Sequence, residues 1–230
     1  MTLAIVSAMH EELAAVLELM PDEHKLTVAG REFWRAHLPG QEVGAVLSRT
    51  GRGAAATTAT VLAERFGVRE LVFTGVAGGL GRGVKVGDVV VAQEFLQHDL
   101  DASPIFPRYE VPLYGQDRFP TDPALTERLV RAAREALPGA GLHRGLVVSG
   151  DRFVSTSAEQ AALQAALPDA LAVEMEGAAI AQVCHDYGIA YAAVRTISDR
   201  ADDAAHGDFV SFVEHVASRH SAAIVKALLT

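Results

Sequence analysis

The chain has 230 residues, of which 50% are hydrophobic and 21% are charged. It can therefore bury one sizeable core, and it has no long polar tract of the kind found in disordered proteins. Its 29 acidic side chains outnumber 20 basic ones, giving a formal net charge of −9 without any run of lysines or arginines. This charge disfavours nucleic acid and anionic membranes as partners. We expect a single domain over residues 1–230.

The cysteine content and the N-terminal segment bear on the cellular compartment. One cysteine, Cys184, excludes an internal disulfide, and its neighbours AQVCHDYG make it a predicted core position of a helix in a reducing compartment. The first apolar run has no basic flank, and no segment approaches the roughly 18 uncharged residues of a membrane span. We expect a cytoplasmic protein.

Apolar segments alternate with segments of helical spacing along the chain. Near-continuous hydrophobicity suits strands that are covered on both faces, so a mostly parallel sheet with helices on both sides is predicted. Strands are predicted at residues 3–7, 42–48, 70–75, 88–95, 145–151, 170–174 and 191–198. Helices are predicted at residues 10–20, 54–66, 123–136, 158–166, 176–187 and 208–228.

Turn and capping residues refine this α/β pattern. Turn signals at Ala29-Gly30 and Pro39-Gly40 predict antiparallel hairpins, so the sheet should be mixed. Ser157 with Gln160 fits a capping box, and Gly188 fits a helix end. Residues 99–122 contain several prolines and little periodicity. They are predicted to be a loop that serves as a lid, a subunit contact or a plain surface excursion.

Two glycine-rich segments invite a cofactor interpretation that the sequence does not sustain. TGRGAAA, at residues 50–56, fits a dinucleotide fingerprint, but Thr74 and Gly75 stand where a ribose-binding acid belongs. We interpret these glycines as a tight strand-to-helix turn. TGVAGGLGRG, at residues 74–83, lacks the lysine and hydroxyl pair of a P-loop. It fits either close approach to a flat ligand or a turn that needs positive φ.

Metal and nucleophile signatures are also incomplete. His98, Asp99 and Asp101 lie close together in HDLD, but no HExxH motif or paired Cys/His spacing accompanies them. No G-x-S-x-G motif is present, and Cys184 is predicted inside a helix. We therefore expect neither a metal nor a cofactor.

Carboxylates follow three of the predicted strands. Glu11 and Glu12 come after the first strand, Glu174 ends the strand ALAVE with Glu176 two residues further on, and Asp199 follows the last strand. Each alone could serve as a helix-start or turn cap. At one sheet edge, however, they would share a crevice in which burial and like charge raise their pKa values. Paired carboxyl groups of this kind cleave glycosidic bonds.

These segments together resemble a known family. AIVSAMHEEL, SRTGRGAAA, VFTGVAGGL, VKVGDVVV, HDLD, GLVVSGDRFV, AVEMEGAAIAQVCH and VRTISDRAD occur in this order and spacing from residue 3 to near the C-terminus. They are similar to the bacterial 5′-methylthioadenosine/S-adenosylhomocysteine nucleosidases of the purine nucleoside phosphorylase superfamily. The resemblance implies a three-layer αβα sandwich around a central mixed, mostly parallel sheet. It also implies a homodimer that hydrolyses the N-glycosidic bond of methylthioadenosine and S-adenosylhomocysteine.

The resemblance assigns roles to individual residues. Asp199 would protonate N7 of adenine with Ser198 orienting it, Glu12 would activate the attacking water, and Glu176 would hydrogen-bond the ribose hydroxyls. The other implied substrate contacts are Met175 against the sugar, Phe153 stacked on the purine, the backbone of Phe153 and Val154 along the purine edge, and Met9, Val76, Ala77 and Gly78. Ile105 and Leu113 would reach the active site of the partner chain.

Several positions depart from the common pattern of the family, and two neighbouring activities stay open. Ser7, His10, Thr50 and Val76 replace residues that are usual there, which leaves the 5′ side of the substrate and the surroundings of the water undetermined. A futalosine or aminofutalosine hydrolase has the same chemistry. A nucleoside phosphorylase is the other alternative, although Glu12 and Val76 offer phosphate no cation and Glu12 would repel it.

Overall fold

The computed structural model describes residues 2–20, 23–38, 41–212, 216 and 218–230, and its elements alternate as the sequence predicts. The strands are β1 Leu3–Ser7, β2 His24–Val28, β3 Arg31–Leu38, β4 Gln41–Leu47, β5 Glu70–Gly79, β6 Val89–Gln97, β7 Arg118–Pro120, β8 Leu142–Ser149, β9 Ala170–Glu174 and β10 Ala190–Asp199. The helices are α1 His10–Leu17, α2 Arg52–Phe66, α3 Pro123–Ala136, α4 Ser157–Ala166, α5 Gly177–Tyr187, α6 Ala205–Phe212 and α7 Ser218–Leu229.

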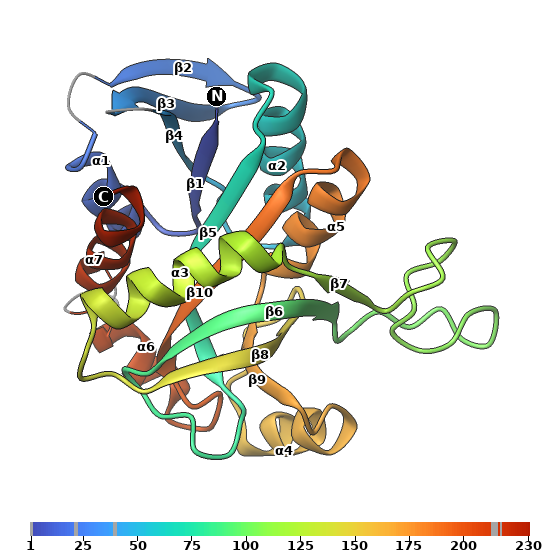
Figure 1. The fold of residues 1–230 in the computed structure, drawn as a ribbon. Helices are drawn as coiled ribbons and strands as arrows, with labels where there is room; N and C mark the ends of the chain where they lie inside the picture. Colours follow the sequence, from blue (N-terminus) through green and yellow to red (C-terminus); the bar gives the residue numbers. More distant parts are fainter. Residues whose placement is uncertain (1, 21–22, 39–40, 213–215, 217) are drawn as a thin grey trace.

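The strands form one mixed sheet, which confirms the predicted α/β fold (Figure 1). The parallel pairs are β1–β4, β1–β5, β5–β10, β6–β8 and β8–β9, and antiparallel pairs include the predicted hairpin of β2 and β3. The long strands β5 and β10 pair along their length, and β5 also pairs with β9 while β10 pairs with β6. The sheet therefore curls back on itself through β5, β10, β6, β8 and β9.

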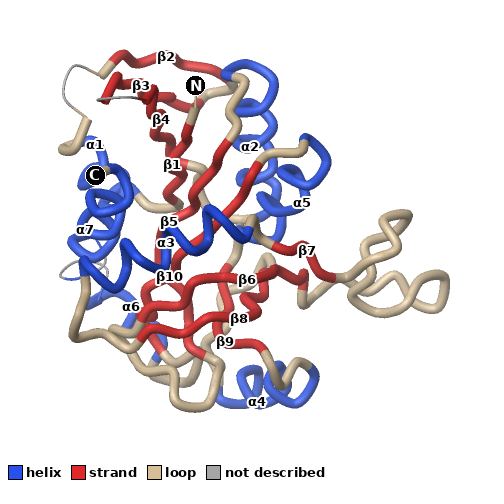
Figure 2. The backbone as a smooth tube through the Cα atoms, in the orientation of Figure 1, coloured by secondary structure: helices blue, strands red, loops and turns tan. Residues whose placement is uncertain are grey.

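Consecutive strand residues point to opposite faces of the sheet and build two separate cores. Ile5, Val72 and Ala192 are in register and pack with residues of α1, α3 and α7. The next residues along these strands, Val6, Phe73 and Ala193, pack with residues of α2 and α5. Figure 2 shows the two helix groups on either side of the strands. Both faces are thus covered, as near-continuous hydrophobicity predicts.

Some predicted boundaries are corrected by the structure. The predicted helix over residues 208–228 corresponds to α6 and α7, and the residues between these two helices, apart from 216, lie outside the described part of the chain. The N-cap of α4 is Thr156, whose side chain accepts a hydrogen bond from the Glu159 backbone, so the predicted box at Ser157 and Gln160 is wrong by one residue. Gly188 ends α5 in the left-handed conformation, as predicted. The predicted Pro39-Gly40 turn lies outside the described residues.

The proline-rich segment between β6 and β7 leaves the body of the molecule as a long projection (Figure 1). Most of residues 99–122 are loop, as predicted, but residues 118–120 form β7 against β6, and Val111 and Gln116 form an isolated bridge. Ile105 and Leu113 are 82% and 91% exposed. This segment thus exposes two large apolar side chains to water.

None of the helices that the structure describes is long and apolar enough to cross a lipid bilayer.

The contact between α5 and β6 generates a prediction about packing. A Cβ at Gly177 would lie 2.2 Å from the Phe95 ring, closer than side chains pack. Gly177→Ala should therefore lower the free energy of unfolding in urea by roughly 1–3 kcal/mol through overpacking. Gly53→Ala in α2 is the matched control, because a Cβ there meets nothing within 4 Å and alanine favours a helix. Equal losses in both variants would contradict the interpretation.

Candidate active site where four strands end

A hollow of about 180 Å³ lies where β1, β5, β9 and β10 end. Nine predicted site residues line it: Met9, Val76, Ala77, Gly78, Phe153, Met175, Glu176, Ser198 and Asp199. Val154 lines a small adjoining hollow together with Phe153 and Asp199. Of the other lining residues, Thr50 and Glu174 were noted in the sequence without a binding role, whereas Ala8, Val173 and Phe209 were not predicted. The strand ends thus bring together residues from distant parts of the chain.

Glu12 is completely buried in the first turn of α1. Its Oε2 accepts a hydrogen bond of 3.3 Å from the backbone N–H of Met9, the N-cap residue. Its Oε1 has no hydrogen-bond partner among the described residues. Burial raises the pKa of Glu12 to about 7, although the positive charge of Arg195 opposes part of that rise. The carboxyl group can therefore exchange a proton near neutral pH.

Glu176 is the N-cap residue of α5, with 5% of its surface exposed. Its Oε1 accepts a hydrogen bond of 2.8 Å from the backbone N–H of Gly51, and its Oε2 lies 3.8 Å from the Arg195 guanidinium. Burial and the adjacent Glu174 carboxylate raise the pKa of Glu176 to about 7. The Gly51 N–H that a dinucleotide fingerprint would offer to a pyrophosphate is thus occupied by a side chain of the protein.

Glu174 differs from Glu176 because its carboxylate is bound on all sides. Its oxygens accept hydrogen bonds from the Ser149 hydroxyl, from the Arg195 guanidinium and from the backbone N–H groups of Glu176 and Gly177. The Ser149 hydroxyl in turn accepts a hydrogen bond of 2.8 Å from the Ala178 N–H. Glu174 therefore joins the ends of β8 and β9 to the start of α5, with little capacity left for a ligand.

Arg195 is a buried cation that sequence reasoning missed. It lies inside β10 with no exposed surface, and its guanidinium lies over the Phe73 ring, 3.6 Å from the ring centre. It pairs with Glu174 and faces Glu176. An arginine in the middle of an apolar strand is itself an available signal, because buried charges are kept only when they are paired.

Two glycines of β5 make room for these charged groups. A Cβ at Gly75 would lie 2.3 Å from Arg195 Nη1 and 3.3 Å from both oxygens of Glu12. A Cβ at Gly78 would lie 2.9 Å from Asp199 Oδ1. The segment from Thr74 to Gly79 belongs to a strand, and the predicted turn with positive φ lies after it, at Gly83, whose φ is 88°. Because glycine has no Cβ, other side chains of the protein can lie close to the β5 backbone at the wall of the hollow.

Asp199 ends β10 and is almost completely buried. Its Oδ2 accepts a hydrogen bond of 2.8 Å from the Ser198 hydroxyl, and its Oδ1 accepts one of 2.8 Å from the Ala201 backbone N–H. The Ala201 backbone has a φ of 53°, an uncommon value for a residue with a side chain. The chain after β10 thus turns back to fix one carboxyl oxygen.

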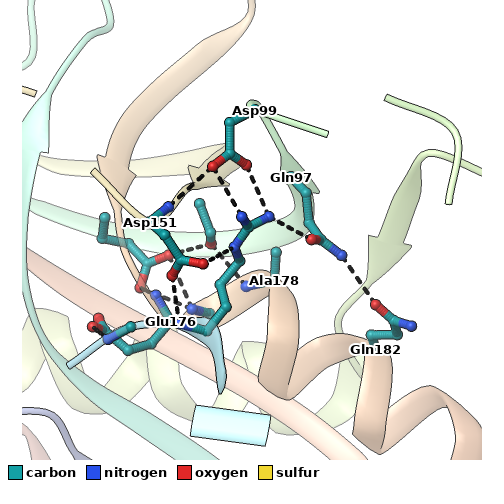
Figure 3. Close-up of polar contacts among 11 residues, drawn as sticks. Gln97, Asp99, Asp151, Glu176, Ala178 and Gln182 are labelled. Atoms are coloured by element: carbon teal, nitrogen blue, oxygen red, sulfur yellow. Dashed lines mark hydrogen bonds and ion pairs between the residues drawn. The ribbon is translucent and has the colours of Figure 1, made fainter. Parts of the chain in front are cut away.

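Arg52 anchors the loop that carries Gly51, and Figure 3 shows its network. Its guanidinium donates to Gln97 Oε1 at 2.6 Å, to Asp99 Oδ2 at 2.9 Å and to Asp151 Oδ2 at 3.2 Å. Its backbone N–H also donates to Asp151, and Asp151 donates its own N–H to Asp99. The network fixes the Gly51 N–H opposite Glu176. Asp99, which the sequence HDLD suggests as a metal ligand, binds Arg52 instead.

The remaining predicted residues lie apart from the hollow or form its edges. Ile105 and Leu113 project into solvent and do not contribute to the site of their own chain. Of the unusual residues, Ser7 is buried at the end of β1, His10 begins α1, and Thr50 and Val76 line the hollow. In the part of the chain that the structure describes, no group of three or more histidine, cysteine or acidic side chains could hold a metal ion.

Comparisons with known proteins agree with this geometry. Residues 2–230 match the family model described as the phosphorylase superfamily. The 5′-methylthioadenosine/S-adenosylhomocysteine nucleosidase from Neisseria meningitidis, solved with methylthio-immucillin-A, is 36% identical over 99% of this chain and 97% of that chain, with a TM-score of 0.93. A futalosine hydrolase of Helicobacter pylori is 32% identical over 99% of this chain and 96% of that chain, with a TM-score of 0.91.

The raised pKa of Glu12 predicts a pH-dependent stability. The carboxyl has an ordinary pKa of 4.5 and one of about 7 in the folded chain, so the folded state binds the proton more tightly. The resulting stabilisation is complete below pH 4.5 and is lost as the pH rises through 7. Glu12→Gln should therefore raise the free energy of unfolding by roughly 1–3 kcal/mol at about pH 8 and change it little at about pH 5.

Urea titrations at both pH values measure this difference. Glu11→Gln is the matched control, because the neighbouring Glu11 side chain is exposed and should show no comparable effect. A stabilisation of the Glu12 variant that is the same at both pH values would contradict the assignment of the raised pKa.

Proposed function

Because the chain belongs to the phosphorylase superfamily and, within it, to the 5′-methylthioadenosine/S-adenosylhomocysteine nucleosidases, we propose that it hydrolyses both of these nucleosides. The enzyme is an N-glycosyl hydrolase, and the proposed products are adenine and the 5-thioribose compound. The observation that carries the proposal is that buried Glu176 and Asp199 line a single hollow, while buried Glu12 accepts a hydrogen bond from the backbone of Met9, which lines the same hollow. Their separate elements converge only in the folded chain.

Asp199 is proposed as the general acid. Adenine leaves poorly as an anion, so a proton delivered to its N7 makes it a neutral leaving group. The Ser198 hydroxyl and the Ala201 N–H hold the two oxygens of Asp199 in place beside the hollow. Phe153 lines the same hollow and packs edge-on against Phe209, with ring centres 5.5 Å apart. This aromatic pair is suited to receive the flat purine.

Glu176 is proposed to bind the ribose hydroxyls, with Met175 against the sugar. The Gly51 N–H fixes one Glu176 oxygen, and the other faces Arg195. The sugar acquires positive charge as the glycosidic bond breaks. A negative Glu176 beneath it therefore binds the transition state more strongly than the ground state.

Glu12 is proposed to orient and deprotonate the attacking water. Its Oε1 has no protein partner among the described residues, and a pKa of about 7 suits a general base at neutral pH. No arginine or lysine lines the hollow as described. Arg52 is held by two aspartates, and Arg82 is exposed. This favours water over phosphate as the nucleophile.

The preference among substrates is part of the proposal. The hollow is walled by Met9, Val76 and Phe209, together with the polar Thr50. We propose that methylthioadenosine, S-adenosylhomocysteine and 5′-deoxyadenosine are all cleaved, with a role in methionine salvage in the cytoplasm. Aminofutalosine hydrolysis is the second candidate, because a futalosine hydrolase is 32% identical to this chain.

We also propose a homodimer in which the projection of one chain closes the active site of the other. Ile105 and Leu113 are large apolar side chains with more than four-fifths of their surface in water. Apolar surface of this kind on a projecting segment is stabilised when a second chain covers it.

Release of adenine tests the assignment of the carboxylates. The protein should liberate adenine from methylthioadenosine and S-adenosylhomocysteine in phosphate-free buffer. Glu12→Gln and Asp199→Asn should each slow the release by about 10²- to 10⁴-fold, because each removes one proton-transfer step. Glu11→Gln, which changes an exposed neighbour of Glu12, serves as the control.

Several outcomes would contradict this mechanism. Near-normal turnover in either the Glu12 or the Asp199 variant would exclude its proposed role. Turnover that requires phosphate would establish a phosphorylase. Preferential cleavage of aminofutalosine over the thionucleosides would favour the alternative substrate. Circular dichroism of each variant shows whether the fold survives, so that a loss of rate can be assigned to chemistry.

Exposed apolar residues on the projection give a prediction about assembly. Ile105→Asp combined with Leu113→Asp should shift the protein from dimer to monomer in sedimentation and lower adenine release at least about ten-fold, because interface energy is concentrated in a few apolar anchors. Leu26→Asp is the matched control, because Leu26 on β2 is also exposed, at 50%. A dimer of full activity in the double variant would contradict the proposed contact.

A further inference from the structure

A second hollow, of about 610 Å³, lies between α1 and the β2–β3 hairpin. The α1 side contributes His10 and apolar residues, and the hairpin contributes Arg31 and Trp34. Arg49, which follows β4, completes the wall. The proposed catalytic mechanism uses none of these side chains.

Two arginines without acidic partners face this hollow. Arg31 donates hydrogen bonds of 3.0 and 3.2 Å to the carbonyls of Ala29 and Ala54, and Arg49 donates one of 2.6 Å to the carbonyl of Gly30. Carbonyl oxygens hold a guanidinium in place but do not neutralise its charge. Within the described part of the chain, neither arginine forms an ion pair. The one acid in the wall, Glu32, is paired with Lys25 at 2.7 Å.

The two positive charges are close enough to affect one another. Burial and the charge of Arg49 lower the pKa of Arg31, so the pair is less stable than two separated arginines. The Nε of Arg31 is buried without a hydrogen-bond partner among the described residues. A guanidinium has five N–H donors, and those of Arg49 are mostly unused by the protein. An anion in the hollow would satisfy both the charge and the donors.

The backbone of Arg49 is also held in an uncommon conformation. Its φ is 66°, in the left-handed region that a residue with a side chain seldom adopts. Such conformations cost free energy and are concentrated at ligand-binding sites. In this conformation the Arg49 side chain donates a hydrogen bond to the Gly30 carbonyl and lines the second hollow.

The second hollow adjoins the active-site hollow on two walls. Met9 lines the active-site hollow and His10, the next residue, lines the second one. Likewise, Thr50 lines the active-site hollow and its neighbour Arg49 lines the second one. Consecutive Cα atoms are about 3.8 Å apart, so the two hollows adjoin at Met9 and Thr50, and a long substituent that leaves the active site on that side enters the second hollow.

We propose that Arg31 and Arg49 bind a carboxylate at the far end of the 5′ substituent of the substrate, an inference that rests on the proposed nucleosidase activity. The enzyme would then favour adenine nucleosides whose 5′ chain ends in a carboxylate over those with a short neutral chain. Both S-adenosylhomocysteine and aminofutalosine have such a carboxylate. Arginine is suited to it because its planar donors match the two carboxylate oxygens.

A matched pair of substrates tests the site. 5′-Deoxy-5′-(3-carboxypropylthio)adenosine and 5′-deoxy-5′-butylthioadenosine have chains of equal length and differ in the terminal charge. The ratio of their kcat/KM values should favour the carboxylate in the unmodified protein. It should fall at least about ten-fold in the combined Arg31→Gln and Arg49→Gly variant, the effect of one lost charge-assisted hydrogen bond.

Controls separate this inference from the catalytic one. Glycine at position 49 accepts the positive φ, so the fold is expected to survive. The variant should cleave methylthioadenosine at an unchanged rate. Arg131→Gln, which changes an exposed arginine of α3, should leave the ratio unchanged. An unchanged ratio in the double variant, or an equal fall with Arg131→Gln, would overturn the site. Absence of adenine release from every substrate would instead refute the nucleosidase activity.

Discussion

The buried guanidinium of Arg195 is the interaction on which the site depends. Three glutamates lie within the range of its charge: Glu12, Glu174 and Glu176. Burying one carboxylate without a counter-charge is costly, and burying several close together is more so. Arg195 compensates for part of this cost from inside β10, where Phe73 beneath it and Glu174 beside it fix its position.

The division of work among the glutamates follows from that arrangement. Glu174 binds Arg195 most closely and has its other contacts filled by Ser149 and backbone N–H groups. Burial therefore raises the pKa values of Glu176 and Glu12, because only a residual attraction to Arg195 opposes it. One fully bound carboxylate thus leaves two others able to change protonation near neutral pH.

Much of this could be predicted from the sequence because strand ends in parallel sheets meet at one edge. That rule brings acids from three strand ends together without any knowledge of the packing, and the family resemblance singles out Glu12, Glu176 and Asp199 among them. The structure brings Glu176 and Asp199 to the same hollow, with Glu12 buried close to Gly75. Arg195 was missed because its partners belong to β9 and α5, far from it in sequence. The sequence alone does not distinguish the environments of three arginines near the site. In the folded chain Arg49 lines the second hollow, Arg52 pairs with two aspartates and Arg82 is exposed.

The glycines of β5 have a consequence for how this chain can change over generations. Gly75 and Gly78 leave space that Arg195, Glu12 and Asp199 occupy from β10 and α1. A larger residue at Gly75 becomes tolerable only after its neighbour across the sheet has become shorter, and that neighbour carries the compensating charge. Substitutions at these positions should therefore be inherited together or not at all. The absent side chains of β5 are as closely tied to the site as the carboxyl groups themselves.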